Sequence, residues 1–567
     1  MPSTQHLRLN SAVKNNDGGC RANLSHPVLA TAKIGQILPI MAEPTLPGDH
    51  FNVRINQFAR FMPLSVPSYV RLNYRTMSVF VPYHQIADGC ESYFSNQKLF
   101  KGVSNSLPKI QNTVFNAFLQ DNTISVPAEN VESAEILFGT NTYKNFTAFG
   151  HYVVKVLHLL GYRWRMKDAD GNLIAASFLP QSNALPILAF AHAYNSYLAY
   201  SATYNVSALS NVLELIKRRS TEDNFITAAE LKTIFTSILL TYEESIFSSA
   251  WKQPYMSVPN QSYEQYRDTA GHATQMTDLT DFSVAMVDGD GAVATTSEDV
   301  SAQQIRLLMK YDEYFRRSNY AGSKDVEQIY SRFGVKIDDY KTRYPYFLGE
   351  SSQEVKIGDV TSTSHTAEAV IGDYAGKAIS DGQCGFNFDS KDYGMLFTFA
   401  WFAPRPLYAN GIDKEVMRLT PFDFYTPEFD QGFASAIMQG QFDTDATNPW
   451  STSFGFHPVY TEYLYSNAKI VGDFERFRGM EAWHFGRTSR ELFDVTAQSD
   501  KLIYMSNSGT PFERIFHVED TDLVDADSIY MTIDVNCMAH RPMRDYTGKT
   551  LLGEGNISLP NMGSQIN

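Results

Sequence analysis

Three residues near the C-terminus, Gly548, Lys549 and Thr550, match the end of a loop that binds nucleotide phosphates. That loop requires a glycine five residues before Gly548, and it connects a strand to a helix. Met543 occupies the required position, and no helical pattern follows it. The spacing therefore argues against nucleotide binding in this part of the chain.

Two acidic runs, at residues 168–172 and 288–291, resemble calcium-binding loops. Such a loop needs glycine at its sixth position, where the chain turns sharply, and glutamate at its twelfth. Leu173 and Val293 occupy the sixth positions, and neither twelfth residue is a glutamate. Both runs are predicted to be turns, and a weakly held surface cation is the most that either would bind.

Other patterns that carry chemistry are absent from the sequence. The 13 histidines form no HExxH motif, and no GxSxG elbow is present. The four cysteines, Cys20, Cys90, Cys384 and Cys537, lie far apart without a CxxC pair, which favours reduced thiols over a zinc site or a disulfide framework. We therefore predict no catalytic residue, no metal site and no cofactor.

The chain is acidic, with 47 basic and 62 acidic side chains and a formal net charge of −15. Phosphate binding needs clustered Lys and Arg, so this chain by itself is a poor candidate for neutralising nucleic acid. Its first 36 residues have the opposite sign, because they contain only Asp17 against Arg8, Lys14, Arg21 and Lys33. They are either a basic arm that contacts anionic material or an ordinary disordered N-terminus.

The elements that would position any site begin with residues 46–82. A Pro47-Gly48-Asp49 turn precedes the strict apolar and polar alternation of Phe51–Asn56, which predicts a half-buried strand. Tyr74–Val81 is rich in aromatic and β-branched residues and ends at Pro82, as expected of another strand. A first strand is predicted over Lys33–Met41.

Strands return late in the chain. Tyr393–Phe402 is a continuous apolar run of strand length, which is typical of a sandwich core. Ile529–Cys537 shows the clearest period-2 alternation in the sequence. Because these segments lie far from residues 46–82, we expect one sheet system that is closed by distant parts of the chain.

Helices are predicted between the early and late strands. Residues 184–200 and 207–219 have helical patterns, and Thr227 and Glu230 form a capping box that starts a third helix. Residues 162–178 read as a hairpin, and residues 350–385 as an extended connection. The apolar run 184–202 contains His192 and Asn195, so it predicts a buried helix, and we expect no membrane insertion.

The 567 residues are compatible with several domains or with one elaborated β-domain. We interpret residues 1–30 as an N-terminal arm. Residues 31–567 then form one domain, with insertions at about 103–183, 184–300 and 301–385. The aromatic content of 13% and the lack of a chemical signature favour a protein that acts through contact surfaces. The alternatives are a carbohydrate-active β-sandwich enzyme and a cell-surface-binding β-sandwich protein.

An ordered series of motifs along the chain resembles the major capsid proteins of the Microviridae, especially the gokushovirus-like branch. LPGDHFNV near the start is similar to the family's LPGDTF segment, and FVPY to its FFVP strand end. ALP with YN resembles LPFRAYN, AWHF resembles AWHLAQ, and AHRPM resembles ARPMP. The residues that carry these matches are Pro47, Gly48, Asp49, Phe51, Val81, Pro82, Pro186, Tyr194, Asn195, Trp483, His484, Arg541 and Pro542.

The resemblance implies a mainly β protein, a single eight-stranded antiparallel jelly roll with large helical and loop insertions. It implies a structural role in which sixty copies form a T=1 icosahedral virion shell around a circular single-stranded DNA genome. The implied partners are further copies of the chain, packaged DNA bound through a small basic protein, a pilot or minor capsid protein, and a host surface receptor. Assembly is expected in the bacterial host cytoplasm. Residues 103–183 and 207–250 and the tail after Met543 are longer than the family pattern.

Overall fold

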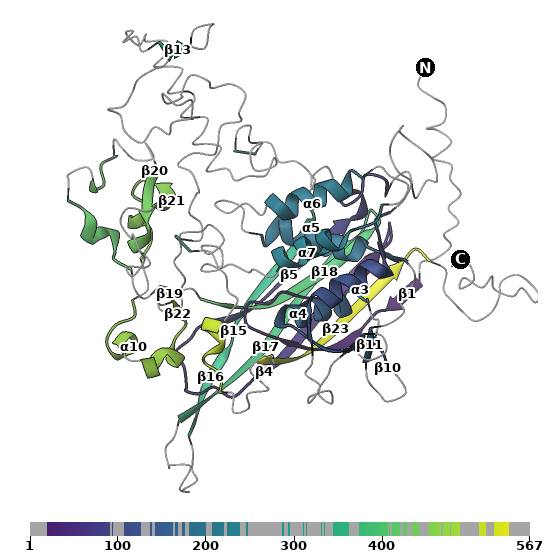
Figure 1. Cartoon of the computed structure of the whole chain (residues 1–567), viewed down its shortest axis with the longest axis horizontal. Helices are drawn as coiled ribbons and strands as arrows, with labels where there is room; N and C mark the ends of the chain where they lie inside the picture. The colour runs from purple at the N-terminus through teal and green to yellow at the C-terminus, as the bar shows by residue number, and fades with distance from the viewer. Residues whose placement is uncertain are drawn as a thin grey trace, which may run out of the picture.

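Two antiparallel sheets face each other at the centre of the protein. The computed structural model describes residues 20–90, most of 107–247, short segments between 286 and 334, and 344–543 with gaps. Figure 1 shows the long strands crossing the molecule. The first sheet has the order β2 (His26–Ala32), β23 (Ile529–Arg541), β4 (His50–Phe61) and β17 (Tyr374–Asp389). The second has the order β15 (Tyr346–Glu354), β5 (Leu72–Pro82), β18 (Gly394–Pro404) and β3 (Leu38–Thr45).

The connectivity of these eight strands is that of a jelly roll. Apart from the step from β5 to β15, each strand is followed by one in the opposite sheet, and neighbouring strands are antiparallel. Two further strands extend the first sheet, β1 (Cys20–Asn23) beside β23 and β16 (Lys356–Thr361) beside β17. Eight strands in two sheets of this kind define the jelly roll, so the predicted fold class is confirmed.

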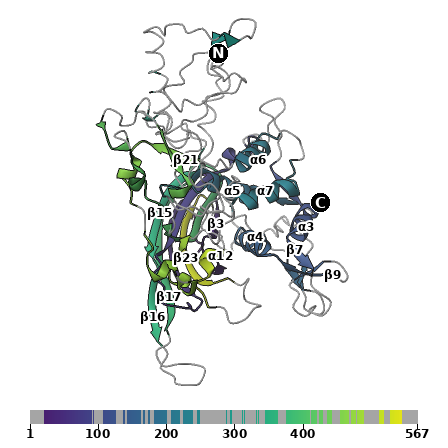
Figure 2. The ribbon, with the colours of Figure 1, turned by 60° about the vertical axis from the view of Figure 1, so that its left-hand side comes forward.

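The two sheets differ in how many of their faces are covered. In β4 and β23 buried and exposed residues alternate, whereas every residue of β18 is buried. The inner faces meet in a shared core, where the Phe80 ring of β5 lies 4.8 Å from the Phe388 ring of β17. Figure 2 shows the helices α3 to α7 together on one side of the sandwich. The alternating strands therefore belong to a sheet with one bare face, and the continuous apolar strand to a sheet covered on both faces.

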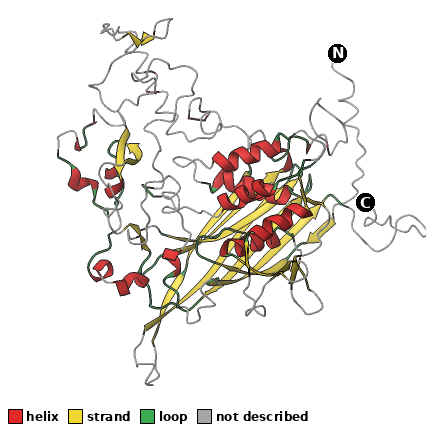
Figure 3. Ribbon diagram, viewed as in Figure 1, coloured by secondary structure: helices red, strands yellow, loops and turns green. Residues whose placement is uncertain are grey.

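A layer of helices covers the outer face of the second sheet (Figure 3). Tyr152 donates a 3.0 Å hydrogen bond to the carbonyl of Ile37, and Phe190 packs on Phe399 with ring centroids 5.5 Å apart. The capping box is confirmed, because Thr227 Oγ1 accepts from Glu230 N–H at 3.3 Å and Glu230 Oε2 accepts from Thr227 N–H at 2.8 Å. The helices are α3 (Asn112–Asp121), α4 (Ala148–Leu159), α5 (Leu185–Tyr197), α6 (Ser207–Lys217) and α7 (Ala228–Ile238).

Short strands accompany these helices. The hairpin predicted over 162–178 is confirmed, since β10 pairs with β11, and a second short hairpin is formed by β13 and β14. The acidic run 168–172 between β10 and β11 lies outside the described residues, as does the tail with Gly548. The strands are β6 (Lys109–Gln111), β7 (Thr123–Ser125), β8 (Ile136–Phe138), β9 (Thr142–Phe146), β10 (Arg165–Lys167), β11 (Leu173–Ala175), β12 (Gln181–Asn183), β13 (Met286–Val287) and β14 (Val293–Ala294).

Between β18 and β23 the chain forms small elements beside one end of the sandwich, on the left of Figure 1. A hairpin of β20 (Ala434–Met438) and β21 (Ser453–Pro458) is followed by the short helix α10 (Asp473–Arg476). β19 (Leu407–Tyr408) pairs with β22 (Gly486–Arg487), and α12 (Thr510–Glu513) precedes β23. We call this part of the chain, residues 405–487, the side lobe.

The predicted N-terminal boundaries need correction. Residues 20–30 are not part of an arm, because β1 and β2 pair along β23 and add the N-terminal segment to the first sheet. The predicted strand Lys33–Met41 is wrong over its first half. Lys33–Ile37 is a turn between β2 and β3, and Gly35 within it has a φ of +83°. Residues 1–19 lie outside the described part of the chain.

The prediction of an extended connection over 350–385, and of an insertion reaching residue 385, is also wrong. β15, β16 and most of β17 fall in this interval, and β17 pairs with β4 over eleven consecutive residues. The segment lacks the usual strand pattern because its outward side chains are polar and glycines occupy two of its inward positions. Gly376 and Gly382 are these two buried glycines.

Gly382 is expected to be intolerant of a side chain. A Cβ at this position would lie 2.6 Å from two ring carbons of Tyr74 and 2.7 Å from the Gln57 amide oxygen. We expect Gly382→Ala to lower the free energy of unfolding by about 1–3 kcal/mol, because the core must shift to admit it. Gly358→Ala in β16 is the matched control, since nothing lies within 4 Å of its Cβ position. Equal urea midpoints for the two variants would contradict this expectation.

Candidate functional site

Two of the quoted motifs meet at one end of the first sheet. The Leu46–Asp49 turn is closed by a 3.1 Å bond from Asp49 N–H to the Leu46 carbonyl, and the Asp49 carboxylate accepts from Leu46 N–H at 2.8 Å. Gly48 adopts a φ of +92°, which glycine tolerates without strain. Its N–H donates to the Ser390 carbonyl at 2.8 Å. The turn thereby joins the start of β4 to the loop between β17 and β18.

Arg541, at the end of β23, packs against this turn. Its Nε lies 3.9 Å from the Asp49 carboxylate, its Nη2 donates to the Pro44 carbonyl at 3.1 Å, and its guanidinium lies 5.7 Å from the centre of the Phe51 ring. A Cβ placed on Gly48 would lie 3.6 Å from Pro542. The motif residues from the two ends of the chain therefore form one junction, which we call the strand-end junction. Its contacts are internal, and they serve to hold the sheet together.

The remaining motif residues are distributed over the fold. Val81 and Pro82 end β5, Pro186 begins α5, and Tyr194 of α5 is buried. The side-chain amide oxygen of Asn195 accepts a 3.1 Å hydrogen bond from the Ser210 hydroxyl, which joins α5 to α6.

Trp483 and His484 lie at the base of the side lobe. Trp483 stacks on Tyr69 with centroids 5.6 Å apart. His484 Nδ1 accepts from Gly486 N–H at 3.0 Å, so Nε2 is the nitrogen that donates to the Phe474 carbonyl, at 3.1 Å. These residues do not converge with the strand-end junction on a common site.

The two described members of the predicted basic arm, Arg21 and Lys33, lie far apart along β23. Arg8 and Lys14 lie outside the described residues, whereas Arg21 is exposed in β1 and Lys33 lies at the far end of β2. Burial raises the pKa of Glu513, and the charge of nearby Lys33 opposes that rise. Lys33 thus compensates a carboxylate of its own chain, and Arg21 is the described member of the set that is fully exposed.

The described helices leave the outward face of the first sheet uncovered. The pairing of its strands places Arg21, His540, His50 and Asp389 in one row across the sheet, and Tyr530 beside Arg60 in another row. We call it the bare face. Sequence reasoning missed it as a site, although the alternation of β4 and β23 already assigns its residues outward. Its exposed charged residues on β1, β4, β16, β17 and β23 are Arg21, Arg54, Arg60, Lys356, Lys377, Asp381, Asp389 and Asp534.

Amide and aromatic groups complete the bare face. Gln383 Nε2 donates to Asn56 at 3.1 Å, and the guanidinium of Arg60 lies 5.5 Å from the centre of the Phe58 ring. Further amides project from the same face, at Asn23, Asn52, Asn387 and Asn536. The arrangement offers many hydrogen-bond donors and little net charge, which suits contact with a polyanion whose charge is neutralised elsewhere.

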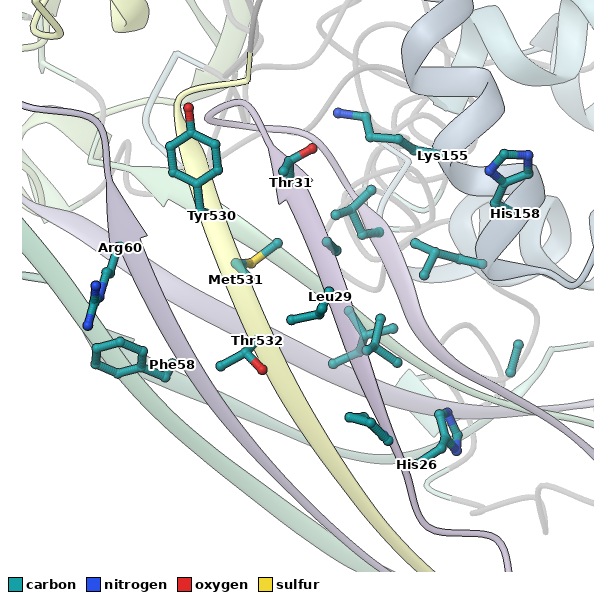
Figure 4. A pocket seen from close by; sticks show the side chains of 17 residues that line it. His26, Leu29, Thr31, Phe58, Arg60, Lys155, His158, Tyr530, Met531 and Thr532 are labelled. Atoms are coloured by element: carbon teal, nitrogen blue, oxygen red, sulfur yellow. The ribbon is translucent and has the colours of Figure 1, made fainter. Parts of the chain in front are cut away.

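A groove of about 940 Å³ runs along the edge strand β2. Figure 4 shows Leu29, Phe58 and Tyr530 on the sheet side and Lys155 and His158 on α4. Lys155 makes a 2.8 Å ion pair with Asp527 and donates to Gln36 at 2.8 Å. Burial lowers the pKa of Lys155 despite this partner. Because Lys155 is already paired and most other lining residues are apolar, the groove has the character of an apolar crevice rather than a reaction site.

A second hollow, of about 310 Å³, lies in the side lobe and contains His457. The ring of His457 bonds the Ile246 carbonyl, and burial lowers its pKa below the usual value, assisted by the charge of Lys414. The unfolded chain therefore binds a proton at His457 more readily than the folded one.

We expect the free energy of unfolding to fall as the pH decreases below about 6.5, by at most about 1.4 kcal/mol per pH unit. His457→Gln should flatten this slope in urea titrations between pH 7.5 and 5.5, and an unchanged slope would contradict the assignment.

The described residues contain no group of three or more His, Cys, Asp or Glu side chains placed to hold a metal ion. Within the same part of the chain, no helix is long and apolar enough to cross a membrane.

Comparison with known proteins decides between the functional alternatives. The chain matches the capsid protein (F protein) family over residues 12–113 and 176–549. The chain belongs to this phage capsid protein family. The match omits residues 114–175, which contain most of α3 and all of α4 and lie within the interval 103–183.

Three viral capsid proteins named VP1 are similar to this capsid protein. That of Bdellovibrio phage phiMH2K is 22% identical over 535 residues, which cover 89% of this chain and 90% of the phage protein. That of Chlamydia phage 1 is 25% identical over 238 residues, 40% of this chain and 39% of its own length. That of Spiroplasma virus 4 is 20% identical over 206 residues, 35% of this chain and 37% of its own.

These matches confirm the resemblance to Microviridae capsid proteins. The capsid protein is a structural component of the virion shell and not an enzyme. Family membership therefore replaces the alternatives of a carbohydrate-active enzyme and a cell-surface-binding protein.

Proposed function

We propose that sixty copies of this capsid protein assemble into a T=1 icosahedral shell around a circular single-stranded DNA genome. The observation that carries the proposal is the asymmetry of the jelly roll, which has helices over one sheet and a bare face on the other. A subunit of a closed shell needs an inner and an outer surface of different character. The full-length similarity to the VP1 protein of a Bdellovibrio phage supports this role.

The bare face is the surface proposed to line the interior. Its eight exposed charged residues, five basic and three acidic, give a net charge of only +2, whereas the whole chain carries a net charge of −15. A lining of this kind avoids repelling DNA phosphates. The amides of Asn52, Asn56 and Asn536 supply hydrogen-bond donors without added charge. In this arrangement the excess of acidic residues lies away from the genome.

The countercharge for the genome must come from another source, because this chain is acidic. A small basic DNA-binding protein, or polyamines and divalent ions, would supply it, with help from Arg8, Lys14 and Arg21. A pilot or minor capsid protein and a host surface receptor are the further proposed partners, and assembly is placed in the bacterial host cytoplasm. Purified particles that hold a genome but no other cationic component would refute the need for such a partner.

The test is to express the full chain, fractionate it by sedimentation and image it by negative-stain microscopy. The proposal expects uniform icosahedral particles, and particles that protect single-stranded DNA from nuclease when the DNA and a basic component are present. A chain that remains monomeric at all concentrations, with and without DNA, would overturn it.

A further inference from the structure

Exposed apolar side chains are concentrated on the side lobe. Ten of the twenty-two large hydrophobic residues exposed in the described part of the chain lie between residues 412 and 474. Leu419 and Leu464 are each 88% exposed, and Val416 is 76% exposed. Scattered apolar residues on a protein surface need no explanation, but a contiguous group marks an interaction site.

The group is contiguous, because side-chain contacts connect its two segments. The guanidinium of Arg418 lies 4.1 Å from the centre of the Tyr463 ring, and Tyr425 packs on Tyr463 with centroids 6.1 Å apart. Lys414 reaches Glu462 at 3.3 Å. We call the described residues of 411–425 and 460–471, which leave out 420–422 and 467–468, the lobe surface.

Arg418 lies beneath this surface with incomplete hydrogen bonding. Its side chain is only 7% exposed, and the nearest carboxylate oxygens, of Glu415 and Glu462, are each 3.7 Å away. Its Nε is buried without a hydrogen-bond partner in the described structure. The guanidinium borders the 310 Å³ hollow that opens among the exposed side chains. A carboxylate or another planar acceptor that entered the hollow would accept the hydrogen bonds that the Arg418 guanidinium does not make within the described structure.

We propose that the lobe surface is a contact between neighbouring copies of this chain. Apolar side chains of the second copy cover Leu419 and Leu464, and an acceptor oxygen of that copy bonds Arg418. The proposal rests on the proposed function, because only an assembling chain requires such a contact.

Three observations favour a second copy over other occupants. The side lobe lies beside one end of the sandwich, away from the helical layer, where neighbouring shell subunits would meet (Figure 1). The described lobe surface has Lys414, Arg418 and Lys469 against Asp413, Glu415, Asp423 and Glu462, a net charge of −1, so it has no net attraction for nucleic acid. Exposed Tyr and Leu around a buried Arg match the composition of tight protein–protein contacts.

The test compares two charged variants with the wild-type chain. Leu419→Lys combined with Leu464→Lys is expected to raise the protein concentration needed for particle formation by at least about tenfold, since two apolar contacts are lost at each interface. Leu215→Lys is the matched control, because Leu215 is 57% exposed and belongs to α6 in the helical layer. Circular dichroism melting checks that every variant is folded.

Sedimentation velocity distinguishes the possible outcomes. The contact is supported if the double variant forms neither particles nor small oligomers while the control variant still assembles. If the wild-type chain forms only small oligomers and the double variant abolishes them, the contact stands and the shell proposal fails. Wild-type particle yield from the double variant overturns the contact. Arg418→Lys, which keeps the charge but loses the planar donors, is expected to weaken association as well, and unchanged association would remove Arg418 from the contact.

Discussion

Arg541→Ala is expected to lower the free energy of unfolding by about 3–5 kcal/mol, the range seen when one partner of a buried ion pair is removed. Asp49 is 0% exposed, and one of its carboxylate oxygens already lacks a hydrogen-bond partner in the described structure. Without Arg541 the carboxylate retains only the bond from Leu46 N–H. Urea denaturation followed by tyrosine and tryptophan fluorescence measures the effect.

Two controls separate the charge from the shape of the side chain. Arg541→Lys keeps the cation and is expected to lose less stability than Arg541→Ala. Arg218→Ala removes an arginine that is 70% exposed and paired with Glu214, where surface pairs contribute about 0–1 kcal/mol. The prediction fails if Arg541→Ala and Arg218→Ala lower the free energy of unfolding by the same amount. A double-mutant cycle with Asp49→Asn isolates the interaction between the two junction residues.

Phe399→Ala is expected to lower the free energy of unfolding by about 3–5 kcal/mol, because it leaves a cavity between the second sheet and its helices. Phe399 is 0% exposed, and its ring packs on Phe190 of α5 and on Phe397, with centroids 5.5 and 5.6 Å away. Phe399→Leu keeps most of the volume and should cost less than about 1.5 kcal/mol. Thermal and urea unfolding measure both variants.

The bare face supplies the comparison for this prediction. Phe58 occupies a strand of the first sheet but points outward, and it is 38% exposed. Phe58→Ala is therefore expected to cost far less than Phe399→Ala, since little apolar surface returns to water. Similar losses for the two variants would mean that the helices do not seal the second sheet in solution.

The strand-end junction was only half predictable. The Leu46–Asp49 turn follows from proline, glycine and an aspartate that bonds a nearby N–H, all within four residues. The contact between Arg541 and this turn could not be predicted from the sequence, because no local signal connects residues nearly five hundred positions apart. The ordered series of motifs pointed to the family without revealing that two of its members touch.

The errors over 20–30 and 350–385 have a common physical reason. β2 contains Pro27 and exposed Leu29, and β17 contains Gly382 and Gly385, so neither segment has the composition of an independent strand. Each becomes a strand because a partner, β23 or β4, offers a complete row of backbone groups. Backbone pairing of this kind can override a weak local preference.

The sequence by itself determined the local features, because turns, helix caps and hydrophobic periodicity depend on residues within a few positions of one another. The alternation of β4 and β23 and the continuous apolar run of β18 even indicated which strands would have one bare face and which would be covered on both. Only the tertiary structure decided that β23 lies between β2 and β4, and that Arg541 meets Asp49. Strand order and register depend on backbone hydrogen bonds between distant segments, and every strand offers the same donors and acceptors to any partner.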